Sequence, residues 1–393
     1  MSVLVINSGS SSIKYQLVNP DTTDVIVSGL VERIGEEMAH IEHTHDGETT
    51  VVDVPIADHK IGLEKILELF DEFGPHLCHD TVSAVGHRVV QGGKYFDKAA
   101  LIDDDVQQRI ADLIPLGPLH NPAHLSGIKV ARSLLPDIPH VAVFDTAFFQ
   151  GLPAEAATYA LDREVAEKYS IRRYGAHGTS HQYVSSKVSE FLGRDDLKQV
   201  VLHIGNGASA SAVVNGHAVD TSMGLTPLEG LVMGTRTGDI DPAVVFHLAR
   251  VGGMSIDEID NLFNRASGLK GLTGSNDMRE VLAGYAEGDE AATVAMNVYV
   301  HRLVKYIGSY TAVMGGIDTL TFTAGVGENS ADVRALVAER LAPFGVKLDP
   351  EKNAVRSREP RVISTDDSRV TVLVVPTNEE LAIARQCMDV IDA

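Results

Sequence analysis

The sequence predicts an α/β protein built from two related domains, and three observations support this prediction. Short apolar runs of strand length recur between segments of helical periodicity, an alternation that is typical of α/β folds. A strand-and-loop pattern near the start of the chain returns near its middle, which indicates a duplication. The chain has 393 residues, more than a single hydrophobic core usually organises.

Six apolar runs are predicted to be buried strands. Each run is continuous rather than alternating, which is typical of strands that are covered on both faces. The runs are residues 3–6, 82–85, 141–144, 200–202, 320–322 and 372–375.

Helices are predicted between these runs. In the first of them, five apolar residues recur at helical spacing and share one face: Leu63, Ile66, Leu67, Phe70 and Phe73. The longest predicted helix runs from about Glu290 to Met314, and Gly315-Gly316 ends it, because glycine is favoured just beyond a helix.

Polar residues predict where three other helices begin. Asp241-Pro242 is typical of an N-cap followed by proline at the first helical position. Ser255 with Glu258, and Thr377 with Glu380, have the spacing of capping boxes.

The internal repeat predicts the domain limits. Residues 3–14 read VLVINSGSSSIK and residues 201–212 read VLHIGNGASASA. Each segment is an apolar strand, a loop of Gly, Ser or Asn, and a second apolar stretch. We therefore expect one domain over residues 1–147, ending just after Asp145, and a second over residues 148–376.

The composition argues against several classes of protein. Hydrophobic residues make up 44% of the chain, which argues against disorder. The net charge of −21 opposes binding to nucleic acids and anionic membranes. Cys78 and Cys387 provide neither a disulfide framework nor a cysteine metal cage. No basic signal segment precedes Val3 and no apolar run approaches the roughly 18 residues of a membrane span, so we expect a cytoplasmic protein.

Three glycine-rich loops have the chemistry of phosphate sites. Residues 7–12 read NSGSSS and precede Lys14, residues 203–207 read HIGNG, and residues 325–330 read GVGENS after a predicted strand. Small residues let backbone N–H groups approach an anion, and a helix start adds a favourable dipole. None has P-loop spacing, and for each loop plain turn chemistry remains the alternative.

Three basic residues stand beside small residues that would let a substrate approach. Arg88 lies between an apolar run and Gly92-Gly93, His177 lies within GAHGTS, and Arg236 lies within GTRTGD. A guanidinium can bind a carboxylate or a phosphate through two parallel hydrogen bonds. Taken singly, each is more typical of a surface arginine or a structural histidine.

Taken together, these segments resemble acetate kinases in order and spacing over residues 2–390. The matching segments are VINSGSSSIKYQL, GHRVVQGG, FDTAFF (144–149), YGAHGTSH, HIGNGAS, MGLTPLEGLVMGTRTGDIDP (223–242), FTAGVGEN and TNEE (377–380). The resemblance implies a duplicated actin-like ATPase fold, with two domains around a central cleft. It implies that the C-terminal helix, residues 377–393, completes the first domain. The implied activity is reversible, Mg²⁺-dependent phosphoryl transfer from ATP to acetate, giving ADP and acetyl phosphate. A homodimer is also implied, with Mn²⁺ as a substitute metal.

The resemblance also implies roles for individual residues. Asp145, His177 and Arg236 match catalytic positions, and Arg88, Val90, Leu119 and Pro227 match positions around acetate. Asn7 and Glu379 match the Mg²⁺ site, and Ser10 and Ser12 match a phosphate loop. The positions that match nucleotide-binding residues are Lys14, His203, Ile204, Gly205, Asn206, Gly207, Asp277, Met278, Arg279, Gly325, Val326, Gly327, Glu328 and Asn329.

The chemistry of the reaction favours electrostatic roles for these residues. Acetate is already ionised near neutral pH, so no base is needed to activate it. We therefore expect Asp145 to orient Arg88 or a metal-bound water rather than to abstract a proton. Arg88 would hold the carboxylate, while Arg236 and His177 would cover the phosphoryl oxygens during direct in-line transfer without a phosphoenzyme.

One departure from the family bears on the substrate. Most acetate kinases have Phe where this chain has Ala176, at the wall of the acetate methyl pocket. The smaller residue predicts a roomier pocket and better use of propionate, unless a neighbouring side chain fills the gap. A nucleotide-driven switch without a small acceptor is the competing class of function. The joint presence of Arg88, His177 and Arg236 argues against it.

Overall fold

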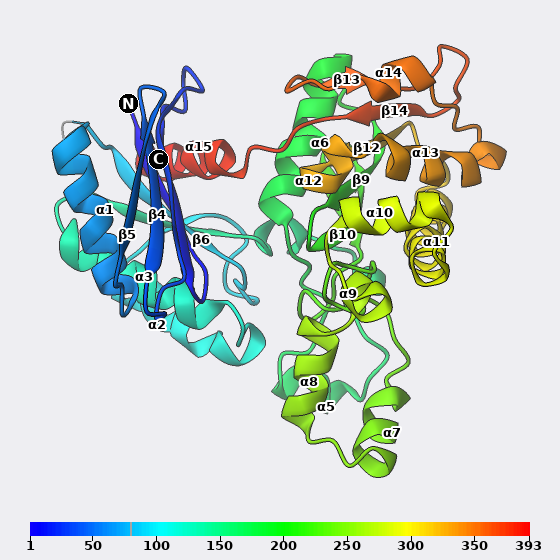
Figure 1. Cartoon of the computed structure of the whole chain (residues 1–393), viewed down its shortest axis with the longest axis horizontal. Helices are drawn as coiled ribbons and strands as arrows, with labels where there is room; N and C mark the ends of the chain where they lie inside the picture. The colour runs from blue at the N-terminus through cyan, green and yellow to red at the C-terminus, as the bar shows by residue number, and fades with distance from the viewer. Residues whose placement is uncertain (79–80) are drawn as a thin grey trace. The chain divides into compact units, whose positions relative to one another are not determined.

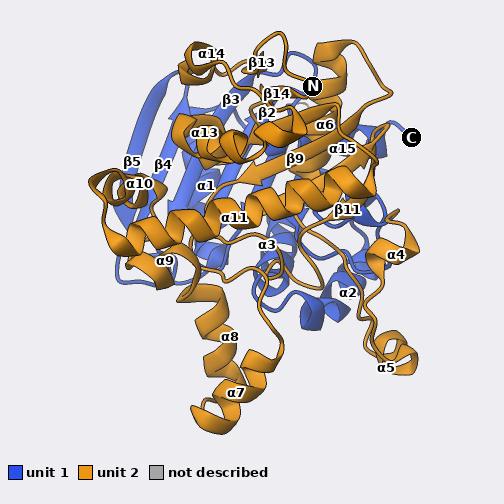
Figure 2. Ribbon diagram, turned by 90° about the vertical axis from the view of Figure 1, so that its right-hand side faces the viewer, with its two compact units in different colours: residues 1–150, 378–393 blue, residues 151–377 orange. Residues whose placement is uncertain are grey.

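The computed structural model describes residues 1–78 and 81–393 and divides them into two compact units. Unit 1 comprises Met1–Gln150 and Asn378–Ala393, and unit 2 comprises Gly151–Thr377 (Figure 2). The domain limits predicted from the sequence, 147 and 376, lie close to these unit bounds. Unit 1 is therefore formed from two separate parts of the chain.

Unit 1 contains an eight-stranded mixed sheet. In spatial order the strands are β5 (Glu48–Val54), β4 (Ala39–His45), β3 (Val25–Glu32), β2 (Ser12–Val18), β1 (Val3–Ser8), β6 (Ala84–Val89), β8 (His140–Phe144) and β7 (Ala100–Leu101). β1 pairs with β2 in antiparallel register and with β6 in parallel register, and β6 pairs in parallel with β8. The parallel strands β1 and β8 are buried on both faces, as their continuous apolar runs predict. β6 begins at Ala84, two residues later than the predicted run 82–85, and continues to Val89.

Helices cover both faces of this sheet (Figure 1). α1 (His59–Phe73) and α3 (Asn121–Leu134) pack on one face, with α2 (Asp104–Asp112) beside α3. α15 (Glu379–Ile391) packs on the other face, against β1, β6 and β8. Its approach requires glycine at position 86, because a Cβ there would lie 2.7 Å from Cys387 Sγ.

The predicted apolar face of α1 is confirmed in part. Leu63, Ile66 and Phe70 are buried against the sheet, whereas Leu67 is only partly buried and Phe73 is 40% exposed. Phe73 is the last residue of the helix, and the chain turns away at Gly74.

Unit 2 contains a six-stranded sheet with a related topology. In spatial order the strands are β11 (His217–Thr221), β10 (Ala208–Val214), β9 (Lys198–Ile204), β12 (Thr319–Thr323), β14 (Thr371–Val374) and β13 (Arg361–Val362). β9, β12 and β14 are parallel, while β10 and β11 continue from β9 as antiparallel hairpins. The order β3-β2-β1-β6-β8 in unit 1 thus corresponds to β11-β10-β9-β12-β14 in unit 2, and the predicted duplication is confirmed.

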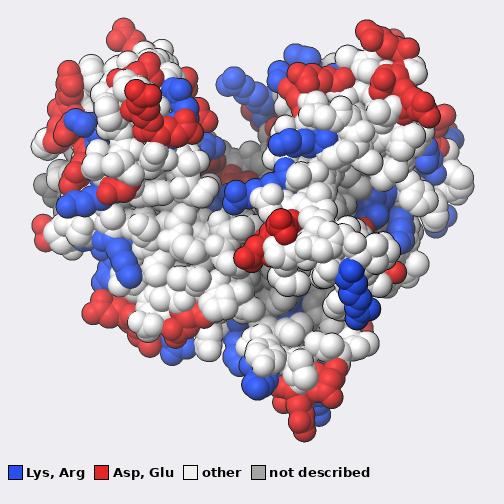
Figure 3. Space-filling view, turned by 60° about the horizontal axis from the view of Figure 1, so that its bottom comes forward, with Lys and Arg blue, Asp and Glu red and all other residues white. Residues whose placement is uncertain are grey.

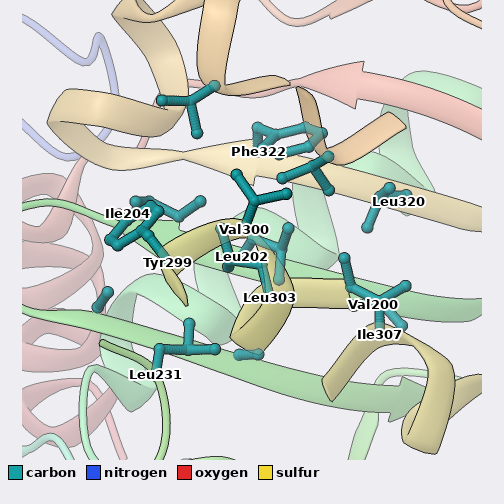
Figure 4. Packing of buried hydrophobic residues seen from close by; sticks show 14 of the residues in the cluster. Val200, Leu202, Ile204, Leu231, Tyr299, Val300, Leu303, Ile307, Leu320 and Phe322 are labelled. Atoms are coloured by element: carbon teal, nitrogen blue, oxygen red, sulfur yellow. The ribbon is translucent and has the colours of Figure 1, made fainter. Parts of the chain in front are cut away.

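Alternate residues of β9 face different helices. Val200, Leu202 and Ile204 pack against Tyr299, Val300, Leu303 and Ile307 of α11 (Glu290–Val313), as Figure 4 shows. Val201 points to the opposite face, where it contacts Val184 and Val188 of α6 (Gly178–Leu192). The two-residue period of the strand therefore builds a core on each side of the sheet.

Shorter helices complete the two units. They are α4 (Ala154–Ala157), α5 (Arg163–Lys168), α7 (Ala243–Val251), α8 (Ile256–Arg265), α9 (Gly268–Thr273), α10 (Met278–Glu287), α12 (Ala324–Asn329), α13 (Ala331–Arg340), α14 (Pro350–Ala354) and the 3₁₀ turns Ile114–Leu116, Ala147–Phe149 and Ala342–Phe344. In the described part of the chain, no helix combines the length and apolarity needed to cross a membrane.

The predicted helix starts have mixed outcomes. The capping box of Ser255 and Glu258 is confirmed at α8. At α7 the N-cap position is Pro242 itself, one residue later than predicted, although the Asp241 carboxylate still accepts from the N–H of Ala243 at 2.9 Å.

The capping box predicted from Thr377 and Glu380 is wrong. The N-cap of α15 is Asn378, whose side chain accepts from the N–H of Leu381 at 3.0 Å. Thr377 has other partners, because its N–H donates to Glu328 at 3.1 Å and its hydroxyl bonds to Ser180 at 2.8 Å.

Candidate active site

The turn between β1 and β2 has the shape of an anion-binding loop. Gly9 N–H donates to the carbonyl of Ser12 at 2.8 Å, and His59 Nε2 bonds to the Gly9 carbonyl at 2.7 Å. Ser10 at the tip is exposed, so its N–H and hydroxyl are accessible to a ligand. Glycine is needed because a Cβ at position 9 would lie 2.7 Å from Ser12 Oγ.

Asn7 and Lys14 lie opposite each other on the two strands of this hairpin. Lys14 pairs with Glu380 on α15, so the charge of the lysine is partly neutralised in this structure. The Asn7 side-chain amide makes no hydrogen bond with other described residues, which leaves its oxygen available to a ligand.

Arg88 is held by two carboxylates at the end of β6. Its Nη2 donates to Asp145 Oδ2 at 2.7 Å, and its Nε lies 3.2 Å from both oxygens of Asp145. Glu379 Oε2 lies 3.5 Å from Nη2. Asp145 is 0% exposed and Arg88 is 19% exposed at its side chain, so the pair is largely shielded from water. Nη1 of Arg88 has no partner among the described residues and is the nitrogen that could grip a substrate carboxylate.

Glu379 carries an oxygen that is suited to a metal ion or a metal-bound water. Oε2 is buried and has no hydrogen-bond partner among the described residues. Burial raises the pKa of Glu379, while the charge of Arg88 acts in the opposite direction. Carboxylate and amide oxygens are the donors that Mg²⁺ takes in proteins, so Glu379 and Asn7 fit such an ion.

Those two oxygens would not form a complete protein cage. Within residues 1–78 and 81–393, no group of three or more His, Cys, Asp or Glu is arranged to hold a metal. Mg²⁺ that arrives with a nucleotide needs only one or two protein carboxylates, because phosphates and waters supply the other ligands.

The sequence reasoning missed the residues that fix the backbone after Arg88. The N–H groups of Val90 and Gln91 donate to His124 Nδ1 at 3.3 Å and to Asn121 Oδ1 at 3.1 Å. Asn121 and His124 belong to α3 and are buried. Their signal in the sequence is the polar pair in HNPAH, which is unusual on a helix that faces a core. Leu119, in the preceding turn, is 37% exposed.

His177 occupies a strained position at the start of α6. It is the N-cap and has left-handed backbone angles, with φ 57° and ψ 23°, a conformation that costs energy in a residue other than glycine. Its ring stacks on that of His203 at 4.3 Å between centroids, and its Nδ1 bonds to Ser209 Oγ at 2.9 Å. His203 is in turn bonded to Ser180 at 2.8 Å.

Arg236 comes close to His177 around Gly207. A Cβ built on Gly207 would lie 3.6 Å from His177 Nε2 and 3.7 Å from Arg236 Nη1. Arg236 donates to the carbonyl of Pro227 at 3.1 Å, and no described carboxylate lies within 4.0 Å of its guanidinium. Burial lowers the pKa of Arg236. The space beside Gly207 therefore faces a cation without a counter-charge, which is the arrangement that binds an anion.

This space gives a direct prediction for Gly207. Gly207→Ala would place a methyl group between His177 Nε2 and Arg236 Nη1, and we expect kcat to fall about 100-fold. The Tm should hardly change, because the nearest atom to the new Cβ would be 3.5 Å away. Steady-state kinetics and thermal melting measure the two effects.

Gly308→Ala is the matched control for this substitution. Gly308 lies within α11 and a Cβ there has no atom within 4 Å, so kcat should be unchanged and the helix slightly more stable. A Gly207→Ala enzyme with normal turnover would show that no reacting group occupies the space.

A cavity of about 1130 Å³ in unit 2 unites three of the predicted nucleotide segments. Its lining includes Gly205 and Asn206 after β9, residues 277–279 at the start of α10, and most of residues 325–329 in α12. A cavity of this size accommodates a nucleotide. The side chain of Ile204, also predicted for this site, is instead buried in the core.

One ion pair and one hydrogen bond between side chains shape the rim of this cavity. Asp277 caps α10 and accepts from Nε and Nη2 of Arg279 at 3.0 and 2.5 Å. These hydrogen bonds lower the pKa of Asp277 to about 2. Asn276 Nδ2 donates to Asn206 Oδ1 at 3.1 Å, which joins the β9 loop to the start of α10.

Arg334 braces the glycine-rich turn and was not predicted from the sequence. It is 2% exposed, and its guanidinium donates to the carbonyls of Gly327 at 2.8 Å and Glu328 at 3.0 Å and to Asn353 Oδ1 at 2.7 Å. Burial lowers the pKa of Arg334 to about 10. Glu328 Oε1 accepts from the N–H of Ala324, which has a φ of 64°. Together these contacts hold a strained turn in place.

The predicted residues thus form two groups, one in each unit. Unit 1 brings together Arg88, Asp145 and Glu379, with Lys14 paired to the next residue of α15. Unit 2 brings together His177, His203, Gly207 and Arg236, and separately lines its cavity with the three nucleotide segments.

Comparison with known proteins places this chain among phosphotransferases. A family model described as the acetokinase family matches residues 2–385. A protein named acetate kinase from Corynebacterium efficiens is 57% identical, with 97% of each chain covered. One of the same name from Streptomyces avermitilis is 55% identical, over 98% of this chain and 96% of the relative.

Solved structures are similar to this chain along its whole length. The crystal structure of Porphyromonas gingivalis acetate kinase matches with a TM-score of 0.93 at 43% identity, covering 99% of both chains. A crystal structure of a propionate kinase from Francisella tularensis matches with a TM-score of 0.93 at 42% identity, covering 98% of both chains.

Proposed function

This chain belongs to the acetokinase family, and from that premise we propose how its residues transfer a phosphoryl group. It is a kinase with the duplicated actin-like ATPase fold of that family, and its reaction is phosphoryl transfer between ATP and acetate. The proposal concerns the roles of the residues, the metal and the assembly.

Unit 1 supplies the carboxylate grip. Arg88 binds acetate through Nη1, the nitrogen that its carboxylate partners leave available. Asp145 receives three contacts from Arg88 and holds the guanidinium in one orientation. Burial acts to lower the pKa of Arg88, but the charges of Asp145 and Glu379 outweigh burial and raise it. Arg88 is therefore a fixed cation, and Asp145 is a positioning residue rather than a proton acceptor.

Unit 2 supplies the hydrogen-bond donors that receive the phosphoryl oxygens. The observation that carries the proposal is the approach of His177 Nε2 and Arg236 Nη1 to one point beside Gly207. A loose phosphoryl-transfer state spreads negative charge over three oxygens, and donors that are fixed in advance stabilise that charge. Since acetate needs no activation, its carboxylate can attack the phosphorus directly, and we propose in-line transfer without a phosphoenzyme.

ATP binds in the cavity lined by residues 205–206, 277–279 and 325–329. Asn7 and Glu379 would hold Mg²⁺, or Mn²⁺ in its place, directly or through waters. When bound, the ion would neutralise charge on the phosphates. The exposed hydroxyl and amide of Ser10 and the charge of Lys14 provide further phosphate contacts in unit 1.

The assembly and location are also proposals. We propose a homodimer, supported by α7, a largely apolar helix in which no residue is buried and Phe246 and Val251 are 56% and 73% exposed. We propose a cytoplasmic enzyme, because the cysteines form no disulfide in the described residues. The strongly acidic composition fits a protein with neither nucleic-acid nor membrane partners. Figure 3 shows separate groups of Asp and Glu side chains on the face in view, with Lys and Arg side chains between them.

One assay tests the activity and its substrate range. Acyl phosphate is trapped as the hydroxamate after incubation with ATP, Mg²⁺ and formate, acetate, propionate or butyrate in turn. We expect acetate to give the highest kcat/KM. ATP turnover without any acyl phosphate would instead indicate a nucleotide switch.

Propionate is the second candidate substrate, because a small residue, Ala176, precedes His177. Ala176 is 1% exposed within unit 2, so a larger side chain here must displace neighbours or extend toward the substrate. We expect Ala176→Phe to lower the ratio of kcat/KM for propionate over acetate about tenfold, as one methylene in an apolar pocket is worth about 1–3 kcal/mol. An unchanged ratio would mean that Ala176 only packs the core. Thermal melting of the variant monitors overpacking.

A further inference from the structure

Two histidines of α6 interleave with two serines of β10. His177 is the N-cap of α6 and His181 lies in its first turn, while Ser209 and Ser211 are two residues apart and share one face of the strand. The Ser211 hydroxyl bonds to His181 Nδ1 at 2.7 Å, His181 Nε2 bonds to Ser209 Oγ at 2.7 Å, and Ser209 Oγ bonds to His177 Nδ1 at 2.9 Å. The four side chains form one continuous chain of hydrogen bonds.

The interior of this chain is closed to water. His181, Ser209 and Ser211 are each 0% exposed. Burial lowers the pKa of His181 well below its usual value, and His203 adds to this effect. His181 is therefore neutral, with a proton on one ring nitrogen and a lone pair on the other. It can accept a hydrogen bond from one serine and donate one to the other, but it cannot donate to both.

Ser211 sets that direction. Each serine hydroxyl has one proton to donate, and a buried proton without an acceptor is costly. The hydroxyl of Ser211 has His181 Nδ1 as its single partner among the described residues. If His181 donated to Ser211, the Ser211 proton would have no acceptor, which disfavours that direction by about tenfold in population.

The favoured direction has a defined outcome at His177. Ser211 donates to Nδ1 of His181, Nε2–H of His181 donates to Ser209, and Ser209 donates to Nδ1 of His177. The proton of a neutral His177 must then be on Nε2. That nitrogen is the one that lies 3.6 Å from the point beside Gly207, where Arg236 Nη1 also approaches.

We propose that Ser211, His181 and Ser209 are positioning residues that hold His177 in the tautomer with a proton on Nε2. In this form a neutral imidazole donates to a phosphoryl oxygen, so Arg236 need not share the space with a second cation. The inference rests on the proposed function of His177 in phosphoryl transfer. It assigns to three residues of the protein interior a role in the reaction that packing alone does not require.

The tautomer can be measured directly in the whole enzyme. Imidazole nitrogens with and without a proton have distinct ¹⁵N shifts, so enzyme labelled with ¹⁵N-histidine reports both nitrogens of His177, assigned by the loss of its signals in His177→Asn. At neutral pH we expect a protonated Nε2 and an unprotonated Nδ1. In Ser211→Ala we expect a mixture of the two tautomers, and in Ser211→Thr, which keeps the hydroxyl, the wild-type form.

The kinetics of the same variants provide a second readout. Ser211→Ala should lower kcat about tenfold with little change in KM for ATP or acetate, and Ser211→Thr should restore most of the loss. His181→Gln places a donor near the position of Nε2 and should retain more activity than His181→Phe. A purely structural role would lower the Tm of the variants without moving the tautomer.

The two arms separate failure of this inference from failure of the proposed function. A wild-type His177 with its proton on Nδ1, or a tautomer that is unmoved in Ser211→Ala, overturns the inference whatever the activity. A His177→Asn enzyme with normal kcat would instead overturn the role of His177 itself. Asparagine suits that control because it tolerates the left-handed backbone of position 177.

Discussion

Replacing Arg236 with alanine should lower kcat about 1000-fold, and replacing it with lysine about 100-fold. The guanidinium donates to the carbonyl of Pro227 at 3.1 Å and to Met233 Sδ at 3.9 Å, both of them neutral acceptors, and it has no carboxylate partner among the described residues. Its charge is therefore available to the transferred group. Deleting a single fixed donor to a developing charge typically costs about 100-fold to 1000-fold in kcat. Lysine keeps the charge but loses the fork that can contact two phosphoryl oxygens. Steady-state kinetics in both directions measure the loss.

Stability should move in the opposite direction to activity at this position. A partly buried cation without a counter-charge opposes folding. The free energy of unfolding of Arg236→Met should therefore equal that of the wild type or exceed it by about 1 kcal/mol. Such a trade-off between stability and activity is typical of residues that take part in the reaction.

Arg340→Lys is the control for replacing an arginine as such. Arg340 lies on α13 and bonds to Asn297 at 2.8 Å on the surface, so both kcat and Tm should stay at the wild-type values. If Arg236→Lys also turned over normally, a forked contact to the phosphoryl group would be excluded.

Asp145→Asn should lower kcat and raise the KM for acetate, together reducing kcat/KM by roughly 100-fold or more. The amide has the shape of the carboxylate but not its charge, so it cannot hold Arg88 through three contacts. Asp145 is 0% exposed, and its loss leaves Arg88 as a largely buried cation that keeps an ion pair with Glu379 at 3.5 Å. Breaking a buried ion pair in this way costs about 3–5 kcal/mol of stability. Denaturant unfolding of Asp145→Asn should show a fall in the free energy of unfolding near the lower end of that range.

The pH profile distinguishes orientation from proton transfer. Because acetate is ionised over the neutral range, the pH dependence of kcat/KM should keep the same limbs in Asp145→Asn at a lower level. A variant that stays active but loses one limb would establish Asp145 as a proton-transfer group and contradict the positioning role.

A double-mutant cycle provides the control for this pair. If Asp145 acts through Arg88, the variant with both Arg88→Met and Asp145→Asn should be little worse than Arg88→Met alone. Additive losses would mean that Asp145 acts on something other than Arg88.

Much of the fold could be predicted because its signals are local. The continuous apolar runs at β1 and β9, each followed by a glycine-rich turn, identify the two halves and their first hairpins. Glycine also identifies points of close approach, as at Gly9 and Gly207, where a Cβ would meet Ser12 or fill the space beside His177. Those positions are constrained by neighbours in sequence or by the ligand, so a single sequence reveals them.

What could not be predicted depends on contacts between distant segments. Thr377 has the spacing of a cap, but Glu328 and Ser180 bind its polar groups. Arg334 has the appearance of a surface arginine in the sequence, and its burial follows only from the turn that it braces. The histidines of α6 and serines of β10 each have an evident spacing. Their interleaving requires knowing which face of each element meets the other.

The place of α15 has a consequence for how the protein is made. Unit 1 is closed on one face by residues 378–393, which follow the whole of unit 2 in the chain. During synthesis the first 150 residues therefore emerge from the ribosome before α15 exists. The face of the sheet around Gly86 stays uncovered until Ile383 and Cys387, which contact it, have been made. The same segment carries Glu379 and Glu380, so a nascent chain without it also lacks the carboxylates that lie beside Arg88 and Lys14. The closing of the first unit and the placing of these two carboxylates therefore both depend on the synthesis of this one segment.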